Sequence, residues 1–181
     1  MTAVRRVVVG VHGSLGSLQA LRAAADEARD RQAVLMPVIA WTPPGGDFAE
    51  RSHPSPYLRQ IWREAARQRL AQAFEAALGG VPDDLAVQAR VDRGEAGPVL
   101  TDVASRPDDL LVIGTGRRSP IVRALRKSVG RYCLAHARCP VLAVPPSALM
   151  EELGHGRMPR SWSLRGRRVL MLEIEQETHQ Q

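Results

Sequence analysis

The sequence predicts an α/β fold: a five-stranded parallel sheet with helices on both faces, similar in kind to a Rossmann fold. Five short apolar segments have the character of strands, stretches with helical periodicity separate them, and glycine, proline or serine marks most boundaries. Strands that alternate with helices run parallel, because right-handed crossovers carry each helix across a face of the sheet. A chain of 181 residues has room for one such domain.

The first half of the chain supplies two buried strands and two helices. Residues 4–10 end in a continuous apolar run, which is typical of a strand buried on both faces. A short turn with the cap candidates Ser14 and Ser17 then leads into a helix that ends near residue 31. Val34–Trp41 is the second strand, in which Pro37 predicts an irregularity or an edge position.

A loop and a long helix follow the second strand. Residues 42–56 are rich in proline and glycine, so we expect a long loop without regular structure. Residues 57–78 carry an apolar stripe at helical spacing, and two glycines end this helix. The stripe consists of Leu58, Ile61, Trp62, Ala65, Leu70, Ala73, Phe74, Ala77 and Leu78.

The second half completes the alternation. Residues 85–91 alternate apolar and polar positions, as an edge strand does, and a short helix begins near Pro98. Asp109–Gly114 is a buried strand, residues 128–137 form a helix, and Val141–Val144 is the last strand. The pattern changes after residue 146, so residues 1–146 are expected to form the domain and residues 147–181 a C-terminal extension.

Composition narrows the classes of protein. No apolar run is long enough for a membrane span and the first residues lack a signal-peptide pattern, so we expect a cytoplasmic protein with no membrane association. The two cysteines fit a reducing compartment. The net charge is +6, but seven basic residues and no acidic one lie between Gly114 and Pro140. With few aromatic residues to stack on bases, this local charge does not favour nucleic-acid binding.

Three segments together resemble the universal stress protein family. These are the opening VVVGVHGS, the segment DLLVIGTGRRS and the closing SVGRYCLAHARCPVLAV, with matching order and spacing over residues 1–146. The resemblance implies the strand order 3-2-1-4-5 and a cytoplasmic homodimer formed through the fifth strand (Val141, Leu142, Ala143 and Val144). It also implies that ATP, with Mg²⁺, binds in the crevice between strands 1 and 4, where the order of an open sheet reverses.

The resemblance carries a set of binding residues onto this chain. They are Gly10, Val11, His12, Val38, Ile113, Gly114, Gly116, Arg117, Lys127, Ser128 and Val129. The ATP-binding members have glycine, two residues, glycine, nine residues, glycine and then serine or threonine. Gly114 and Ser128 match this pattern, whereas Arg117 and Lys127 replace two glycines and His12 replaces an acidic residue. The basic side chains could neutralise phosphates, or they could fill the place of the ligand.

Other candidate motifs for ligand or metal binding are less specific. Gly10, Gly13 and Gly16 do not have dinucleotide-binding spacing, and Lys127-Ser128 lacks the glycines of a phosphate-binding loop. The series Cys133, His136 and Cys139 has no fourth ligand nearby in sequence, which favours a core cysteine and a helix-terminal histidine over a metal site. Asp108 and Asp109 precede the fourth strand at the opposite end from the expected site, so we interpret them as loop or capping residues.

Two functional hypotheses follow. In the first, the protein is a stress-response regulator or sensor that binds ATP or a related adenine nucleotide. In the second, it is a nucleotide-independent dimer that acts through regulatory protein partners. Slow ATP hydrolysis is a third, weaker hypothesis, because neither Ser14, Ser128 nor His12 is singled out as a catalytic group by a known hydrolase motif.

Overall fold

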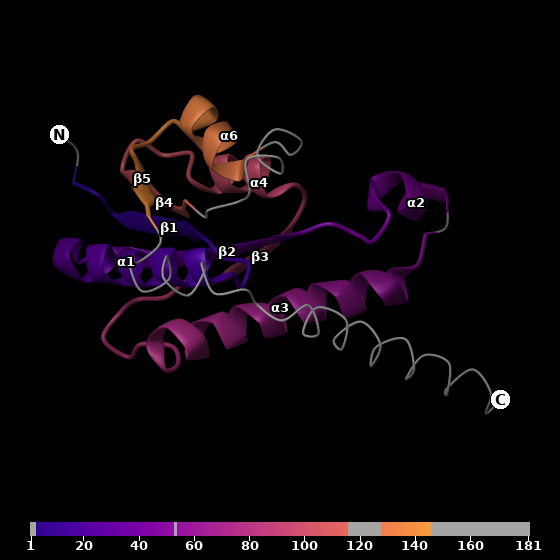
Figure 1. The fold of residues 1–181 in the computed structure, drawn as a ribbon, viewed down its shortest axis with the longest axis horizontal. Helices are drawn as coiled ribbons and strands as arrows, with labels where there is room; N and C mark the ends of the chain where they lie inside the picture. Colours follow the sequence, from indigo (N-terminus) through magenta and orange to yellow (C-terminus); the bar gives the residue numbers. More distant parts are fainter. Residues whose placement is uncertain (1–2, 53, 116–127, 146–181) are drawn as a thin grey trace, which may run out of the picture. The chain divides into compact units, whose positions relative to one another are not determined.

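The computed structural model describes residues 3–52, 54–115 and 128–145, and these form a doubly wound α/β domain (Figure 1). Five parallel strands are ordered β3-β2-β1-β4-β5, as predicted. The strands are β1 (Arg6–Gly10), β2 (Val34–Trp41), β3 (Arg90–Arg93), β4 (Asp109–Gly114) and β5 (Val141–Val144). The helices are α1 (Leu15–Arg31), α2 (Gly46–Ser52), α3 (Pro56–Leu78), α4 (Ala96–Val103) and α6 (Val129–His136). The predicted extension, residues 147–181, lies outside the described residues.

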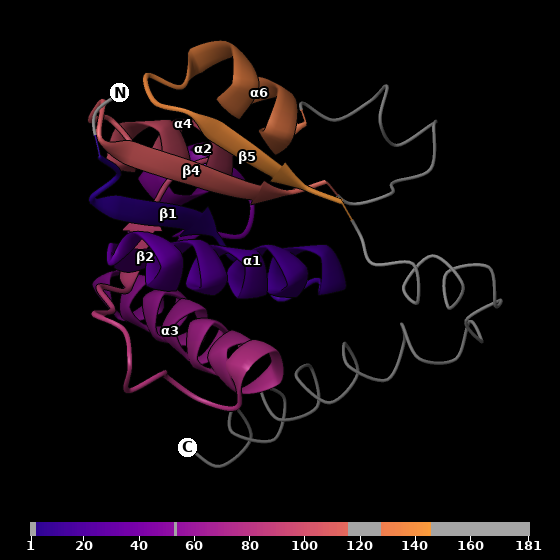
Figure 2. The ribbon, with the colours of Figure 1, turned by 90° about the vertical axis from the view of Figure 1, so that its left-hand side faces the viewer.

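The helices form two layers, one on each face of the sheet (Figure 2). In β1, Val7 and Val9 pack into the core beneath α1 and α3, whereas Val8 faces the core beneath α4 and α6. Successive side chains of a strand point to opposite faces, so a strand covered on both sides must be apolar at every position. This explains why β1 and β4 appear in the sequence as continuous apolar runs.

Pro37 lies inside the sheet and not at its edge. It is fully buried in β2 and pairs with Val9 of β1. Leu35, two residues earlier, exchanges backbone hydrogen bonds with the chain at Ala86 and Gln88, so the ring nitrogen of Pro37 faces the same side. The β2–β3 pairing is irregular there, because an isolated bridge at Val87 is separate from β3, which starts at Arg90. The predicted irregularity is therefore confirmed, and the strand predicted over 85–91 begins later.

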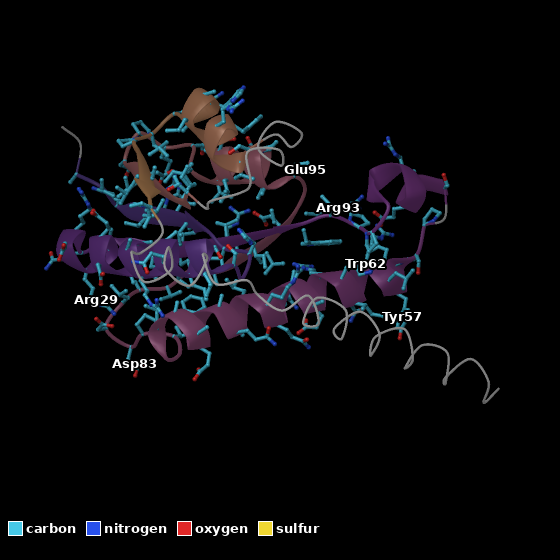
Figure 3. The ribbon with its side chains drawn as sticks, in the orientation of Figure 1. Arg29, Tyr57, Trp62, Asp83, Arg93 and Glu95 are labelled. Carbon is cyan, nitrogen blue, oxygen red and sulfur yellow. The ribbon has the colours of Figure 1, made fainter. Side chains whose placement is uncertain are left out.

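The segment predicted to be an irregular loop contains the helix α2. A carboxylate anchors this helix: Glu50 Oε1 lies 3.1 Å from Arg59 Nε of α3, and Oε2 lies 2.5 Å from Arg93 Nη2 of β3. The Glu50 side chain is only 7% exposed. Figure 3 labels Arg93 and Trp62 in the region where α2 and the first turns of α3 come together. The loop prediction was wrong because it relied on the local proline and glycine content. In the folded chain, contacts with residues distant in sequence hold this segment as a helix.

The first turns of α3 extend past the sheet, whereas the helix packs on the core from Trp62 and Ala66 onward. A 23-residue helix is about 35 Å long, whereas even the eight residues of β2 span only about 26 Å, so the helix extends past the strands. Leu70, Ala73, Phe74 and Ala77 are buried. Leu58 and Ile61, predicted in the same apolar stripe, are 41% and 43% exposed, and their neighbour Tyr57 is 73% exposed.

Candidate nucleotide-binding site

The sheet reverses its order of connection between β1 and β4. From β1 the chain moves outward through β2 to β3, and it then returns to the other side of β1 for β4 and β5. The neighbouring strands β1 and β4 are in register, with Val9 opposite Val112. Ligands of open α/β sheets bind outside the carboxyl ends of the strands at such a reversal. The candidate site therefore lies beyond Gly10 and Gly114.

The end of β1 is built from tightly packed backbone. The Val11 N–H donates to the Val38 carbonyl of β2 at 2.9 Å, and both side chains are buried. A Cβ atom on Gly10 would lie 2.8 Å from Leu100 Cδ1, so α4 closes this face of the strand end. Val11 and Val38, both predicted site residues, are therefore joined by their backbones next to the end of β1, and their side chains belong to the core.

The turn after β1 presents polar side chains at the same edge. Gly13 has a φ of +83°, a left-handed conformation that favours glycine. Ser14 caps α1, and its Oγ accepts the Ser17 N–H at 3.3 Å. The His12 ring is exposed, and its Nε2 lies 3.1 Å from Ser14 Oγ. Both residues are candidates in the sequence, but nothing in the sequence predicts that they contact each other. A local sign of this contact is that His12 and Ser14 flank a single glycine, Gly13, in a short turn.

The end of β4 meets the start of α1 backbone to backbone. A Cβ atom on Gly114 would collide with the carbonyl oxygen of Gly16 and lie 2.8 Å from its carbonyl carbon. Any larger residue here would require the backbone to shift. Ile113 is 3% exposed, and Thr115 continues toward β5 with its N–H donating to the Val144 carbonyl at 2.8 Å.

The start of α6 lies beside the end of β4. A Cβ atom on Gly130 would be 3.6 Å from Ile113 Cδ1 and 3.8 Å from Ser128 Oγ, so the first turn of α6 packs close to Ile113. Ser128 has the extended backbone of an N-cap, but its hydroxyl makes no capping hydrogen bond. Val129 is the first residue of the helix. The N-terminus of a helix attracts anions through its N–H groups and dipole.

Three predicted site residues, Gly116, Arg117 and Lys127, lie outside the described residues. The other eight lie at the ends of β1 and β4, within β2 at Val38, which pairs with Gly10, and at the start of α6. Among residues 3–52, 54–115 and 128–145, no group of three histidine, cysteine or acidic residues is placed to hold a metal ion.

The Cys133, His136 and Cys139 series is divided among different environments. Cys133 is completely buried, and burial raises the pKa of its thiol to about 11. The Cys139 thiol donates to the Ala104 carbonyl at 3.5 Å, and burial raises its pKa as well. The exposed His136 ring stacks on Tyr132, with Nδ1 2.9 Å from the Tyr132 carbonyl oxygen. Cys133 therefore belongs to the core.

Asp109 is not a loop residue, and its interpretation as one was wrong. Its carboxylate is fully buried at the amino end of β4, where it pairs with Arg6. The N–H of Arg106, in the turn before β4, also donates to it at 2.9 Å. The pair lies at the opposite end of the sheet from the candidate site, so it is structural. Arg6 and Asp109 are 103 residues apart, so local sequence patterns could not predict that they pair.

Together the fold and this edge define an open-sheet α/β protein whose strand order reverses between β1 and β4. The sequence model of the Universal stress protein family matches residues 3–145. The chain therefore belongs to the universal stress protein family.

Solved structures agree with this assignment. A universal stress protein in complex with cAMP is 26% identical, with a TM-score of 0.54, and the match covers 81% of this chain and all of the other. The universal stress protein UspA from Lactobacillus plantarum has 22% identity and a TM-score of 0.54 over 80% of this chain and 99% of its own. A universal stress protein from Archaeoglobus fulgidus has 22% identity and a TM-score of 0.52 over 77% and 93%.

In the part of the chain that the structure describes, no helix has the length and apolar character needed to cross a membrane.

Proposed function

We propose that this protein is a cytoplasmic stress-response regulator or sensor that binds ATP or a related adenine nucleotide between the ends of β1 and β4. One observation carries the proposal: two glycine-containing strand ends and the starts of α1 and α6 meet at the edge where the strand order reverses. This combination offers backbone N–H groups and two helix dipoles to a phosphate.

The ligand class is supported by a relative. The 26% identical universal stress protein whose structure was solved with cAMP covers the whole domain and contains an adenine nucleotide. In this chain, phosphates would lie near Ser128 and Val129, with Mg²⁺ as the counter-ion of a triphosphate. Ser128 is suited to such a role because its hydroxyl is not used for capping.

A second candidate is a nucleotide-independent protein that acts through regulatory protein partners. Its specific support is that Arg117 and Lys127 occupy two positions where the ATP-binding pattern has glycine. Side chains at positions that require close backbone approach would occupy the volume of the phosphates.

Titration of the full-length protein with ATP and Mg²⁺, and separately with cAMP, tests the first candidate. We expect heat of binding, and adenine nucleotide released on denaturing protein purified from cells. Ser128→Asp should weaken binding about tenfold, equivalent to ~1.4 kcal/mol, because a carboxylate repels phosphate. Aspartate is also a good N-cap, so the helix itself should tolerate this change.

The matched control is Ser55→Asp, which makes the same change at the N-cap of α3. It should leave binding unaltered. If neither ligand produces heat and no nucleotide is released, the first candidate is wrong and the second is favoured.

We also propose a homodimer formed through β5. This strand is at one edge of the sheet that the described residues form, so on one side its backbone groups pair with no described strand. Val141 and Leu142 are half-buried and Ala143 is exposed. Light scattering at micromolar concentration should give the mass of a dimer, and Ala143→Glu should shift it toward the monomer. A monomeric mass for the unmodified protein would contradict this proposal.

A further inference from the structure

The first turns of α3 carry an apolar stripe on the side away from the core. Leu58, Ile61 and Ala65 are spaced by three and four residues, so they share one face of the helix. All three are exposed, and the adjacent Tyr57 is 73% exposed. Trp62, in contrast, packs against the core, and in Figure 3 the labelled Tyr57 and Trp62 lie on opposite sides of α3.

Exposed apolar side chains are concentrated at this stripe. Six large apolar side chains are exposed in the part of the chain that the structure describes, and three of them lie within residues 57–61. Single exposed apolar residues are ordinary on a protein surface, whereas a contiguous apolar patch usually marks a site of interaction. We call Tyr57, Leu58, Ile61 and Ala65 the outer patch.

The outer patch is held in place although α3 extends past the sheet here. Ser55 caps the helix by accepting the Leu58 N–H at 3.3 Å. In the next turn, Arg59 pairs with the buried Glu50 of α2, which also pairs with Arg93 of β3. A short helical segment is marginal in water without such contacts. Because the outer patch is already ordered, a partner that binds it would lose little of its affinity to ordering this surface.

Basic residues surround the outer patch. Residues 57–69 contain four arginines and one glutamate, which gives a net charge of +3. Arg69 is exposed one turn beyond Ala65 on the same face, and its Nε donates to the Ala65 carbonyl at 3.3 Å. Arg63 is exposed as well. Complementary charge favours an acidic partner for this face.

A second copy of this chain fits the outer patch poorly, because pairing α3 with itself would bring two segments of charge +3 together. The three large side chains expose an apolar area on the order of 300 Å², well below the ~800 Å² that each partner buries in a stable complex. A helix from another protein is a better match. Apolar residues of an amphipathic helix recur at the same spacing of three and four positions as Leu58, Ile61 and Ala65.

We propose that the outer patch and Arg69 form a docking site for an acidic amphipathic helix of another protein. The apolar side chains of that helix pack on Leu58, Ile61 and Ala65, and one of its carboxylates pairs with Arg69. The small apolar area makes the complex transient, which suits a regulatory interaction. The site would serve the second candidate function and requires no bound nucleotide, so the nucleotide titration above and the test below have independent outcomes.

The test uses a fluorescent synthetic helical peptide of about 18 residues, with leucine at every third or fourth position and glutamate on both flanks. Anisotropy at an ionic strength of about 0.15 M measures its binding to the full-length protein, where charges distant from the contact are screened. We expect a Kd in the micromolar range. Ile61→Glu should weaken binding at least tenfold, because it places a charge against the leucines of the peptide. Arg69→Glu should weaken it about tenfold, because it replaces an attraction by a repulsion.

The matched controls make the same changes elsewhere on the surface. Val81→Glu alters an apolar residue that is 60% exposed outside α3, and Arg67→Glu alters an exposed arginine on the other side of α3. Both should bind the peptide within twofold of the unmodified protein. Circular dichroism should show that all four variants are folded, because each change is at a surface position.

Three results would overturn the proposal. One is no binding by the unmodified protein, and another is equal weakening in the variants and their controls. The third is binding that persists when lysine replaces the glutamates of the peptide. If vesicles of anionic lipid bind and the peptide does not, the outer patch contacts a membrane surface instead. If Ile61→Glu lowers the mass measured by light scattering, the patch joins two copies of the chain, which also contradicts the proposal.

Discussion

The guanidinium of Arg6 and the carboxylate of Asp109 face each other at the first pair of the β1–β4 register, joined by two hydrogen bonds of 2.7 Å. Asp109 is fully buried, and Arg6 also donates to the Val103 carbonyl at 3.2 Å. The hydrogen bond that Arg6 donates to Asp109 raises the pKa of Arg6, so the arginine stays charged at any working pH. The ion pair ties the two central strands together at the end of the sheet away from the site.

Asp109→Asn should lower the free energy of unfolding by ~3 kcal/mol, because it leaves the Arg6 charge without its partner in a largely buried position. Urea denaturation followed by circular dichroism measures this. Asp108→Asn is the control: Asp108 is only half-buried, so its change should be within ~0.5 kcal/mol. Equal effects of the two substitutions would show that the pair has no special role.

Gly114→Ala should destabilise the domain by ~1–3 kcal/mol, because the new methyl group collides with the Gly16 carbonyl. Gly130→Ala provides the comparison, since its Cβ would make only ordinary contacts of 3.6 and 3.8 Å. Alanine has less backbone freedom than glycine in the unfolded chain, so in the first turn of α6 it should stabilise the helix by up to ~1 kcal/mol. Thermal unfolding of both variants checks the opposite signs. A Gly114→Ala protein as stable as the unmodified one would contradict the close backbone approach.

Glu50→Gln should release α2. A neutral amide holds Arg59 and Arg93 less strongly than the carboxylate does, so the helix should detach more often. Arg51 is exposed on α2, and trypsin should therefore cleave after it several-fold faster in the variant. Mass spectrometry of the early fragments measures the rate. Glu64→Gln, which removes an exposed partner of Arg67, should cleave at the unmodified rate, and equal rates in both variants would count against the anchor.

Cys133 should resist alkylation in the folded protein. Its pKa of about 11 leaves roughly one-thousandth of the thiol ionised at pH 8. In a Cys139→Ala protein, iodoacetamide should react with Cys133 in urea and hardly at all without it. Reaction at the same rate in both conditions would show that the thiol is accessible.

The same shift predicts a pH dependence. The usual thiol value is 9.0, so the unfolded chain ionises first, and the stabilisation from neutral Cys133 is present below about pH 9. It is lost as the pH rises through about 11. Denaturation midpoints measured at increasing pH should fall over this range, and less so in a Cys133→Ala protein.

Most elements could be predicted because their signals are local. Three strands were predicted with the bounds that the structure shows: Val34–Trp41, Asp109–Gly114 and Val141–Val144. The first two are covered on both faces, so they are apolar at almost every position. The helix α2 was missed because a proline- and glycine-rich segment predicts a loop. Its anchor, Glu50, depends on arginines 9 and 43 positions away in the sequence. The apolar stripe on α3 was also misleading, because it is longer than the part of the helix that packs on the core. The sequence does not show where the sheet beneath the helix ends.

The candidate site was partly predictable for a similar reason. The resemblance placed Gly10, Gly114 and Ser128 together, and the structure brings these positions to one edge of the sheet. The hydrogen bond between His12 and Ser14 depends on the conformation of Gly13, which the sequence permits without specifying.

The sequence by itself determined where the strands and most helices form, because periodicity and capping act over a few residues. Tertiary structure alone decided which polar groups meet. Arg6 and Asp109 are 103 residues apart and become partners only when β1 and β4 lie side by side, and Gly114 reaches Gly16 through the same pairing. A buried charge must find its counter-charge, but the sequence does not say which one until the strand order is known.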